Sequence, residues 1–327
     1  MKKVAIGIDI GGTNTMFGIV DSIGNCLVKK NILTTDFETP EKLIITIYKE
    51  VQVMLLSLSD VIPVGIGIGA PNGNYYNGTI EYAPNLKWKG VINLIQLFRK
   101  YFDIPVYVTN DANAAAIGEM TYGVAKNSKD FVIITLGTGL GSGIVCNGQL
   151  VYGHDGFAGE LGHTIVEENG RECACGRKGC LETYVSATGI VRTAHIMLAE
   201  HSKPSLLRKT SDDKITAKTI AEAAQKGDAL ALDIFDFTAK KLGLSLSNLV
   251  AITSPEMIVL FGGLANSGES ILDPTQKYME ENLLLIFKNK IKIIPSSIKG
   301  NEAAIMGASS LVWNELKKEQ LEKTSLN

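Results

Sequence analysis

The feature that most constrains the fold is a pattern of two apolar strands joined by a Gly/Thr-rich turn, which occurs twice. The first copy starts at Val4 and turns at Gly11-Gly12-Thr13; the second starts at Phe131 and turns at Gly137-Thr138-Gly139. Counted from Val4 to Phe131, the copies begin about 127 residues apart. This repeat predicts a duplicated architecture, with one copy in each of two lobes and the two turns facing each other across a cleft.

Strands and helices alternate along the rest of the chain, which predicts an α/β protein. A loop rich in Gly, Pro and Asn is expected over 69–85, and a frayed tail is expected up to Asn327. Helices are expected over 41–58, 93–101, 112–120, 183–200, 216–226, 229–250 and from 302 to about 318.

Length and charge narrow the class of protein. A chain of 327 residues is long enough for two domains. Its 32 basic and 34 acidic residues leave a net charge of −2, so no electrostatic feature points to nucleic acid or an anionic membrane as a partner. The first residues are too polar for a signal peptide, and no apolar run is long enough to span a bilayer. We therefore expect a cytoplasmic protein with reduced cysteines.

The two turns are candidates for phosphate binding. Glycine lets backbone N–H groups approach phosphate oxygens, and a threonine hydroxyl adds a donor. Either turn alone is equally typical of a hairpin that merely needs glycine, but a pair of them favours two cradles for one phosphate chain. The absence of a Gly-Lys dipeptide excludes a Walker A loop, and turns that lead into strands argue against a dinucleotide site. Asp9, at the end of the first strand, is suited to hold Mg²⁺ or its water shell.

Asp111 is the candidate catalytic base. It lies in Thr109-Asn110-Asp111-Ala112-Asn113, between the end of a strand and an alanine-rich helix. Asp and Asn are favoured helix caps, so a capping role is the simplest interpretation. A phosphoryl transferase also needs a group that accepts the proton of the attacking hydroxyl, and ligands usually bind at the carboxyl ends of α/β strands. The two roles are compatible.

Three cysteines, Cys173, Cys175 and Cys180, fall within eight residues of each other. Three free thiols in a polar loop would be reactive, and a disulfide is disfavoured in a reducing compartment. A closed structural zinc site needs a fourth ligand, and of the four histidines we choose His163, which lies ten residues before Cys173. This zinc would fix the loop that carries Glu160 and Glu182 beside the substrate.

The segment Gly159-Glu160-Leu161-Gly162-His163, followed by Cys173-x-Cys175-Gly-x-x-Gly-Cys180-Leu-Glu182, resembles the signature of the ROK family of bacterial sugar kinases and sugar-responsive repressors, particularly its glucokinase-like members. The resemblance extends from Asp9-Ile-Gly-Gly-Thr13 to the final helix. It implies the actin-like ATPase (ribonuclease H-like) fold with two lobes around a central cleft. We expect residues 1–111 with about 308–327 to form a smaller, discontinuous lobe. Residues 112–307 would form the larger lobe, with the zinc loop and part of the nucleotide site.

The resemblance also implies residue roles, with Asp111 as the catalytic base and Gly262-Gly263 near the adenosine. It implies zinc ligands at His163, Cys173, Cys175 and Cys180. It implies sugar contacts from Asn85, Asn110, Asp111, Glu160, His163 and Glu182. The residues expected around ATP and Mg²⁺ are Asp9, Gly11, Gly12, Thr13, Gly137, Thr138, Gly139, Gly262 and Gly263.

One stretch departs from the family pattern. Where the family more often has Pro-Gly followed by an acidic residue, this chain has Pro71-Asn72, followed by Tyr75-Tyr76. We expect this departure to shape the sugar pocket. The nearby Asn85-Leu-x-Trp88 resembles glucose-type members, although Trp88 can equally be a buried anchor of its loop.

The leading hypothesis is that the chain phosphorylates a hexose with Mg-ATP, in particular glucose at its 6-hydroxyl. Alternatives in the same class are kinases for N-acetylmannosamine, mannose, fructose or allose. A sugar-sensing repressor would carry a helix-turn-helix ahead of this core, and a first strand beginning by Val4 leaves no room for one. A cytoskeletal or chaperone ATPase is a third option, which the Glu160–His163 loop and the cysteines disfavour. Family members are commonly dimers or tetramers, so a homo-oligomer is expected.

Overall fold

The computed structural model describes residues 1–298 and 302–325, which divide into two compact units. Unit 1 comprises Met1–Asn127, Leu150–Ala158 and Ser297–Asn327, and unit 2 comprises Ser128–Gln149 and Gly159–Ser296. The predicted lobes differ from these units mainly in the segment that follows Asp111. That segment belongs to unit 1 because its helix, α3 (Asp111–Tyr122), packs against α9 (Ala303–Ser325). The predicted cleft stays a prediction.

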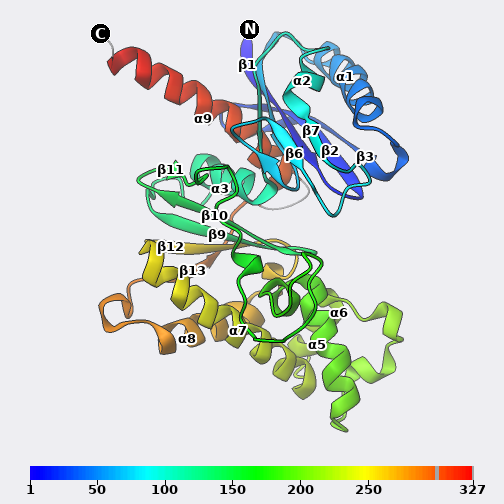
Figure 1. Ribbon diagram of the computed structural model, residues 1–327, viewed down its shortest axis with the longest axis vertical. Helices are drawn as coiled ribbons and strands as arrows, with labels where there is room; N and C mark the ends of the chain where they lie inside the picture. Colours follow the sequence, from blue (N-terminus) through cyan, green and yellow to red (C-terminus); the bar gives the residue numbers. More distant parts are fainter. Residues whose placement is uncertain (299–301, 326–327) are drawn as a thin grey trace. The chain divides into compact units, whose positions relative to one another are not determined.

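The two units contain sheets of the same strand order, which confirms both the α/β class and the predicted duplication. In each sheet a hairpin is followed by two parallel strands (Figure 1). The order in unit 1 is β3-β2-β1-β4-β8, with β1 Lys2–Ile10, β2 Asn14–Asp21, β3 Cys26–Leu33, β4 Val61–Gly69 and β8 Val106–Thr109. The second sheet has the order β11-β10-β9-β12-β13, with β9 Phe131–Leu136, β10 Leu140–Cys146, β11 Gln149–Leu150, β12 Met257–Phe261 and β13 Lys292–Pro295.

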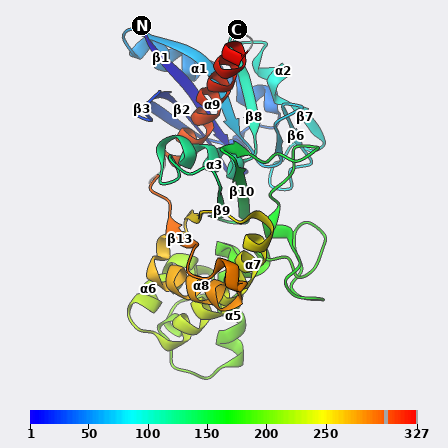
Figure 2. The ribbon, with the colours of Figure 1, turned by 90° about the vertical axis from the view of Figure 1, so that its left-hand side faces the viewer.

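The alternation of isoleucine and glycine in β1 and β4 assigns the two faces of the first sheet. Ile6 and Ile8 point into the core shared with α1 (Pro40–Ser57) and α2 (Leu94–Phe98). On the opposite face, a Cβ added at Gly67 would lie only 1.9 Å from the backbone oxygen of Ala308 in α9. Because glycine has no side chain, α9 packs against the sheet backbone itself (Figure 2).

The second sheet is covered on one face by a layer of helices. Val132, Ile134 and Leu136 of β9 pack into this core, as expected when alternate side chains of a strand face the same way. Figures 1 and 2 show the helices gathered on this face. They are α5 Ala187–Glu200, α6 Ala217–Gln225, α7 Ala229–Thr253 and α8 Glu269–Asn282. In the parts of the chain that the structure describes, no helix is long and apolar enough to cross a membrane.

Three predicted helices have wrong boundaries, of which the one expected over 93–101 is α2 and already ends at Phe98. The helix expected over 183–200 is interrupted by Ser186, whose extended backbone (ψ 174°) separates α4 (Glu182–Val185) from α5. The Ser186 hydroxyl accepts a hydrogen bond from the Gly189 amide at 3.0 Å and so caps α5. The final helix continues to Ser325, so most of the expected frayed tail is helical; residues 326–327 lie outside the described residues.

The loop expected over 69–85 contains two short strands. These are β5 (Gly73–Asn74) and β6 (Thr79–Glu81), which pair with each other, and β6 also pairs with β7 (Val91–Asn93). Short 3-10 helices complete the structure: η1 Thr34–Asp36, η2 Leu161–His163, η3 Leu206–Lys209, η4 Asp212–Lys214, η5 Ala265–Ser267 and η6 Leu285–Phe287.

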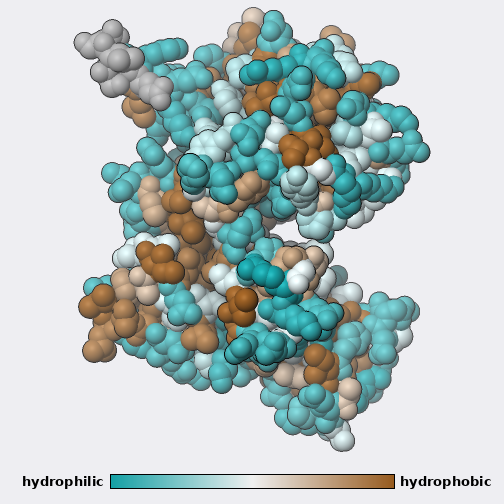
Figure 3. Space-filling view, in the orientation of Figure 1, coloured by the Kyte–Doolittle hydropathy of each residue, from teal (hydrophilic) through white to brown (hydrophobic). Residues whose placement is uncertain are grey.

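An apolar cluster is exposed between α8 and β13 in unit 2. Leu284, Leu285 and Ile286 have exposed fractions of 59%, 89% and 64%, so they do not contribute to the core. Figure 3 shows the corresponding hydrophobic patch at its lower left. Contiguous exposed apolar side chains of this kind often mark a surface for a partner.

Candidate functional site

Two carboxylates meet at the carboxyl ends of the parallel strands in unit 1. Asp9 of β1 pairs in register with Gly69 of β4, which in turn pairs with Thr109 of β8, so the three strands end at one level. A Cβ added at Gly69 would lie 3.6 Å from Oδ1 of Asp9 and 3.7 Å from the Cα of Asp111. The structure therefore brings the predicted base and the predicted Mg²⁺ carboxylate to opposite sides of the same glycine.

Helix capping at this edge is performed by Asn110. Its side-chain oxygen accepts a hydrogen bond from the Asn113 amide at 2.6 Å, in the typical geometry of an N-cap. Asp111 is the first helical residue, and its Oδ1 accepts from the Ala112 amide at 2.9 Å. The helix therefore has its cap without Asp111, which leaves a chemical role open to that carboxylate.

The pKa values of both carboxylates are raised. Burial, followed by the nearby charge of Asp111, raises the pKa of Asp9 to about 7. Desolvation by the surrounding protein also raises the pKa of Asp111, although hydrogen bonds from backbone amides partly oppose it. A carboxylate with a raised pKa is a stronger base, and two neighbouring carboxylates favour the uptake of a proton or a cation.

The turn between β1 and β2 lies against the loop that carries Asn85. The Gly11 amide donates to the Asn14 carbonyl at 2.8 Å and closes the turn, while a Cβ added at Gly12 would lie 2.4 Å from the backbone oxygen of Asn85. Trp88 in the same loop is 7% exposed, and its Nε1–H donates to the Phe37 carbonyl at 3.1 Å. The interpretation of Trp88 as a buried anchor is thereby confirmed.

The departure at Asn72 has a local structural explanation. Asn72 has a φ of 52°, in the left-handed region that favours glycine and, among other residues, asparagine. Its side-chain amide donates to the Glu81 carbonyl at 2.9 Å, and the Glu81 amide donates to the Asn72 carbonyl at 3.2 Å. Asn72 is therefore used to pair the two sides of this loop.

Residues next to Asn72 hold the segment 150–158 within unit 1. Nδ2 of Asn74 donates to the Asp155 carbonyl at 2.8 Å, and the rings of Tyr75 and Tyr152 stack with centroids 4.0 Å apart. The segment 150–158 ends two residues before Glu160. Asn74 and Tyr75, in the stretch that departs from the family pattern, thus hold the segment next to Glu160, a predicted sugar contact.

The turn between β9 and β10 in unit 2 is held by Glu182. The Gly137 amide donates to the Gly139 carbonyl at 3.0 Å and closes the turn. Oε2 of Glu182 accepts from the Leu140 amide at 2.9 Å, and a Cβ added at Gly139 would lie 2.3 Å from this oxygen. The structure therefore places Glu182, predicted as a sugar contact, against the predicted phosphate turn.

The Gly262-Gly263 pair lies next to the same turn. A Cβ added at Gly262 would lie 2.7 Å from the backbone oxygen of Leu136, the residue before the turn, whereas one added at Gly263 would meet nothing within 4 Å. The pair that was predicted to lie near the adenosine is thus adjacent to the predicted phosphate turn, and Gly263 borders open space.

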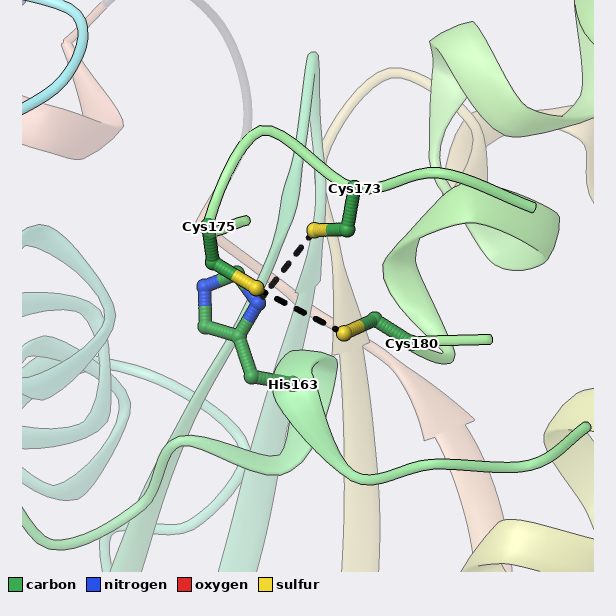
Figure 4. A group of neighbouring side chains, drawn as sticks. All are labelled: His163, Cys173, Cys175 and Cys180. Carbon is green, nitrogen blue, oxygen red and sulfur yellow. Dashed lines mark hydrogen bonds between the residues drawn. The ribbon is translucent and has the colours of Figure 1, made fainter. Parts of the chain in front are cut away.

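The ligand atoms of His163, Cys173, Cys175 and Cys180 all lie within 4.8 Å of one another (Figure 4). Sγ of Cys173 lies 3.7 Å from Nδ1 of His163, and Sγ of Cys175 lies 3.6 Å from Sγ of Cys180. Tetrahedral zinc with Zn–S bonds of about 2.3 Å requires sulfurs about 3.8 Å apart. The spacing and the donor set therefore fit one zinc ion.

The surroundings of the cluster favour a thiolate at Cys175, whereas burial raises the pKa values of Cys173 and Cys180. Burial raises the pKa of Cys175, but hydrogen bonds from Arg177 and from the neighbouring thiols outweigh it and lower this pKa to about 6. The other face of His163 points to Glu160, with Nε2 4.0 Å from Oε2. His163 thus has one ring nitrogen toward the cysteines and the other toward a predicted sugar contact.

The sequence did not single out two further residues near these groups. Asn113 is 1% exposed, and neither side-chain polar atom has a hydrogen-bond partner among the described residues. The hydroxyl of Thr188 donates to the Thr138 carbonyl at 2.9 Å. Ser186 is a typical helix cap, so the sequence could place Thr188 in the first turn of a helix. Nothing in the local sequence indicates that Thr188 contacts a turn fifty residues away.

Comparison with known proteins gives concordant matches. A family model described as "ROK family" matches residues 5–315. The glucokinase of Halalkalibacterium halodurans is 37% identical over 94% of each chain. The structure of a ROK family glucokinase from Streptomyces griseus, in complex with glucose and AMPPNP, is 33% identical with a TM-score of 0.79, covering 94% of this chain and 98% of that one. A xylose repressor of Caldicellulosiruptor bescii is 29% identical over 95% of this chain and 78% of its own length.

Proposed function

The chain belongs to the ROK family, and from this premise we propose that it is a glucokinase that phosphorylates glucose with ATP. The observation that carries the proposal is the placement of Asp9 and Asp111 on either side of Gly69, at the carboxyl ends of three parallel strands. This arrangement offers a base and a cation-binding carboxylate at one point, as phosphoryl transfer to a hydroxyl requires.

In the proposed reaction, a carboxylate oxygen of Asp111 accepts the proton of the sugar 6-hydroxyl. The oxygen of that hydroxyl then forms a bond to the γ-phosphorus of ATP. The bond from that phosphorus to the leaving oxygen of ADP breaks. Asp9 would hold Mg²⁺, which neutralises charge on the phosphates when bound. Backbone N–H groups of the turns at 11–13 and 137–139 would hold the phosphate oxygens. The raised pKa of Asp111 supports its role as the base.

The sugar would be held by polar side chains that are already ordered by their neighbours. Asn110 is fixed as a helix cap, Glu160 lies beside His163, and Glu182 is held by the Leu140 amide. Together with Asn85 they would bind sugar hydroxyls, and a site built in this way rejects analogues that lack a hydroxyl because its polar groups are left unpaired.

We further propose that His163, Cys173, Cys175 and Cys180 hold a structural zinc ion. The distances between their ligand atoms support this, and four protein ligands leave no open position for catalysis. Its role would be to close the loop that links Glu160 to Glu182.

A cytoplasmic location and a homo-oligomeric state, dimer or tetramer, complete the proposal. The exposed Leu284–Ile286 cluster is the surface at which this proposal can be tested. Light scattering would test this: Leu285→Ser should lower the oligomeric mass, and an unchanged oligomer would exclude this cluster from the interface.

The decisive experiment is a coupled ADP-release assay over glucose, N-acetylmannosamine, mannose, fructose and allose. We expect glucose to have the highest kcat/KM. Sugar binding, seen as thermal stabilisation, without ADP release would instead favour a sugar-sensing regulator. No response to any sugar would favour an ATPase of another class.

A further inference from the structure

The metal cluster and the 137–139 turn are joined by one short segment of unit 2, residues 180–188. Its first residue, Cys180, belongs to the metal cluster. Its last residues contact the turn: the Ala187 amide donates to the Gly137 carbonyl at 2.8 Å, and the Thr188 hydroxyl donates to the Thr138 carbonyl at 2.9 Å. Two successive carbonyls of the turn are thus bound by two successive residues of this segment.

Glu182 makes the link from the other side of the turn. Its Oε2 accepts from the Leu140 amide at 2.9 Å, and its Oε1 lies 3.9 Å from Sγ of Cys173. One carboxylate therefore contacts both the strand that leaves the turn and a ligand of the metal cluster. Its position depends on both.

The direction of the hydrogen bonds at Thr188 is determined by chemistry. A carbonyl oxygen can only accept, so the Thr188 hydroxyl must donate to Thr138. That hydroxyl lies 2.9 Å from the Ser186 hydroxyl, which accepts from the Gly189 amide at 3.0 Å and so has its proton available for Thr188. The hydrogen bonds therefore run from the Gly189 amide through the hydroxyls of Ser186 and Thr188 to the Thr138 carbonyl, and each hydroxyl donates once and accepts once.

We propose that Thr188 and Glu182 are positioning residues. When the metal cluster is formed it fixes residues 180–188, and the hydrogen bonds of Thr188 and Glu182 then hold the 137–139 turn in one conformation. The Gly137 amide closes the turn, so carbonyls held on one side of it would orient the Thr138 and Gly139 N–H groups toward a ligand. The metal cluster would then support nucleotide binding as well as the sugar loop. This inference rests on the proposed role of the 137–139 turn in phosphate binding.

The test compares Thr188→Val with Thr188→Ser in the full-length, zinc-loaded protein, with affinity for AMPPNP and affinity for glucose measured separately. Thr188→Val removes the donor at nearly constant volume, so we expect AMPPNP affinity to fall about fivefold, the effect of one lost hydrogen bond. Glucose affinity and zinc content should stay unchanged, and Thr188→Ser should restore AMPPNP affinity. Thr193→Val is the matched control, because its hydroxyl donates to Gly189 of its own helix.

A second arm removes the metal from the wild-type protein with a chelator and follows its loss by elemental analysis. Here AMPPNP affinity should fall together with glucose affinity. The inference is overturned if Thr188→Val binds AMPPNP like the wild type, if it loses glucose affinity instead, or if metal removal leaves AMPPNP binding intact. A wild-type protein that neither binds AMPPNP nor releases ADP would instead refute the proposed function itself.

Discussion

Asp9 and Asp111 lie on either side of Gly69, and the charge of Asp111 adds to burial in raising the pKa of Asp9 to about 7. Two carboxylates in one place repel each other unless a proton or a cation lies between them. The pair therefore favours the binding of a cation between its carboxylates, and a kinase needs such a cation, Mg²⁺, when ATP binds.

Substitution of Asp111 by asparagine should abolish most turnover. Loss of the base is expected to lower kcat by at least about 100-fold, because the hydroxyl proton then has no acceptor of suitable strength. Sugar binding should remain measurable by calorimetry, since the asparagine keeps the size of the side chain. Asp103→Asn, at an exposed position, is the control and should leave kcat unchanged. Substantial activity in the Asp111 variant would refute its assignment as the base.

The pH profile of kcat/KM should show a raised acidic limb. The base must be ionised to act, and desolvation raises the pKa of Asp111 above the ordinary aspartate value of about 3.9. As the pH falls through this raised pKa, the carboxylate takes up a proton and the rate declines. An acidic limb that coincides with the pKa of an exposed aspartate would contradict this assignment.

Asp9→Asn should stabilise the protein against unfolding while it removes activity. The folded-state pKa of Asp9, about 7, lies above its unfolded value of 3.8, so ionisation disfavours the folded state. The advantage of the asparagine variant should be absent below pH 3.8, grow between pH 3.8 and 7, and be complete above pH 7. A rise of about 3 in the pKa, at about 1.4 kcal/mol per pKa unit, sets an upper limit of about 4 kcal/mol on this difference in the free energy of unfolding in the absence of Mg²⁺. Equal stability of the two proteins at pH 8 would contradict the shift.

Gly67→Ala should destabilise unit 1. Its Cβ would lie 1.9 Å from the Ala308 backbone oxygen, so α9 would have to move away from the sheet, at a cost of about 1–3 kcal/mol or more. Gly65→Ala lies on the same strand and face, but its Cβ meets mainly the side chain of Val312, at 2.7 Å, and it should cost less. Urea denaturation measures both, and equal effects would argue against backbone contact as the cause.

Purified protein should contain one zinc ion per chain. Cys180→Ser should lose it, with a lower melting temperature, because the remaining ligands no longer form a closed tetrahedral site. Cys146→Ser lies outside the cluster and should retain the metal. Elemental analysis of the two variants distinguishes them, and zinc retained by Cys180→Ser would refute the ligand assignment.

Features that depend on nearby residues could be predicted from the sequence. The glycine turns, the helix cap next to Asp111 and the spacing of the cysteines all follow from local backbone geometry and side-chain chemistry. The duplicated strand pattern was visible because each copy of the hairpin is a local unit.

Features that depend on distant residues were decided by tertiary structure. The break at Ser186 starts a new helix, and Thr188 in the first turn of that helix donates to the Thr138 carbonyl. The hydrogen bond from the Asn72 side chain to the Glu81 carbonyl, nine residues along the chain, could not be read from the local sequence. Sequence patterns carry the short-range preferences of the backbone and of each side chain, so they located the two turns and the start of the helix at Asp111. Which carbonyl or carboxylate each group then contacts depends on packing across dozens of residues, and only the folded chain determines that.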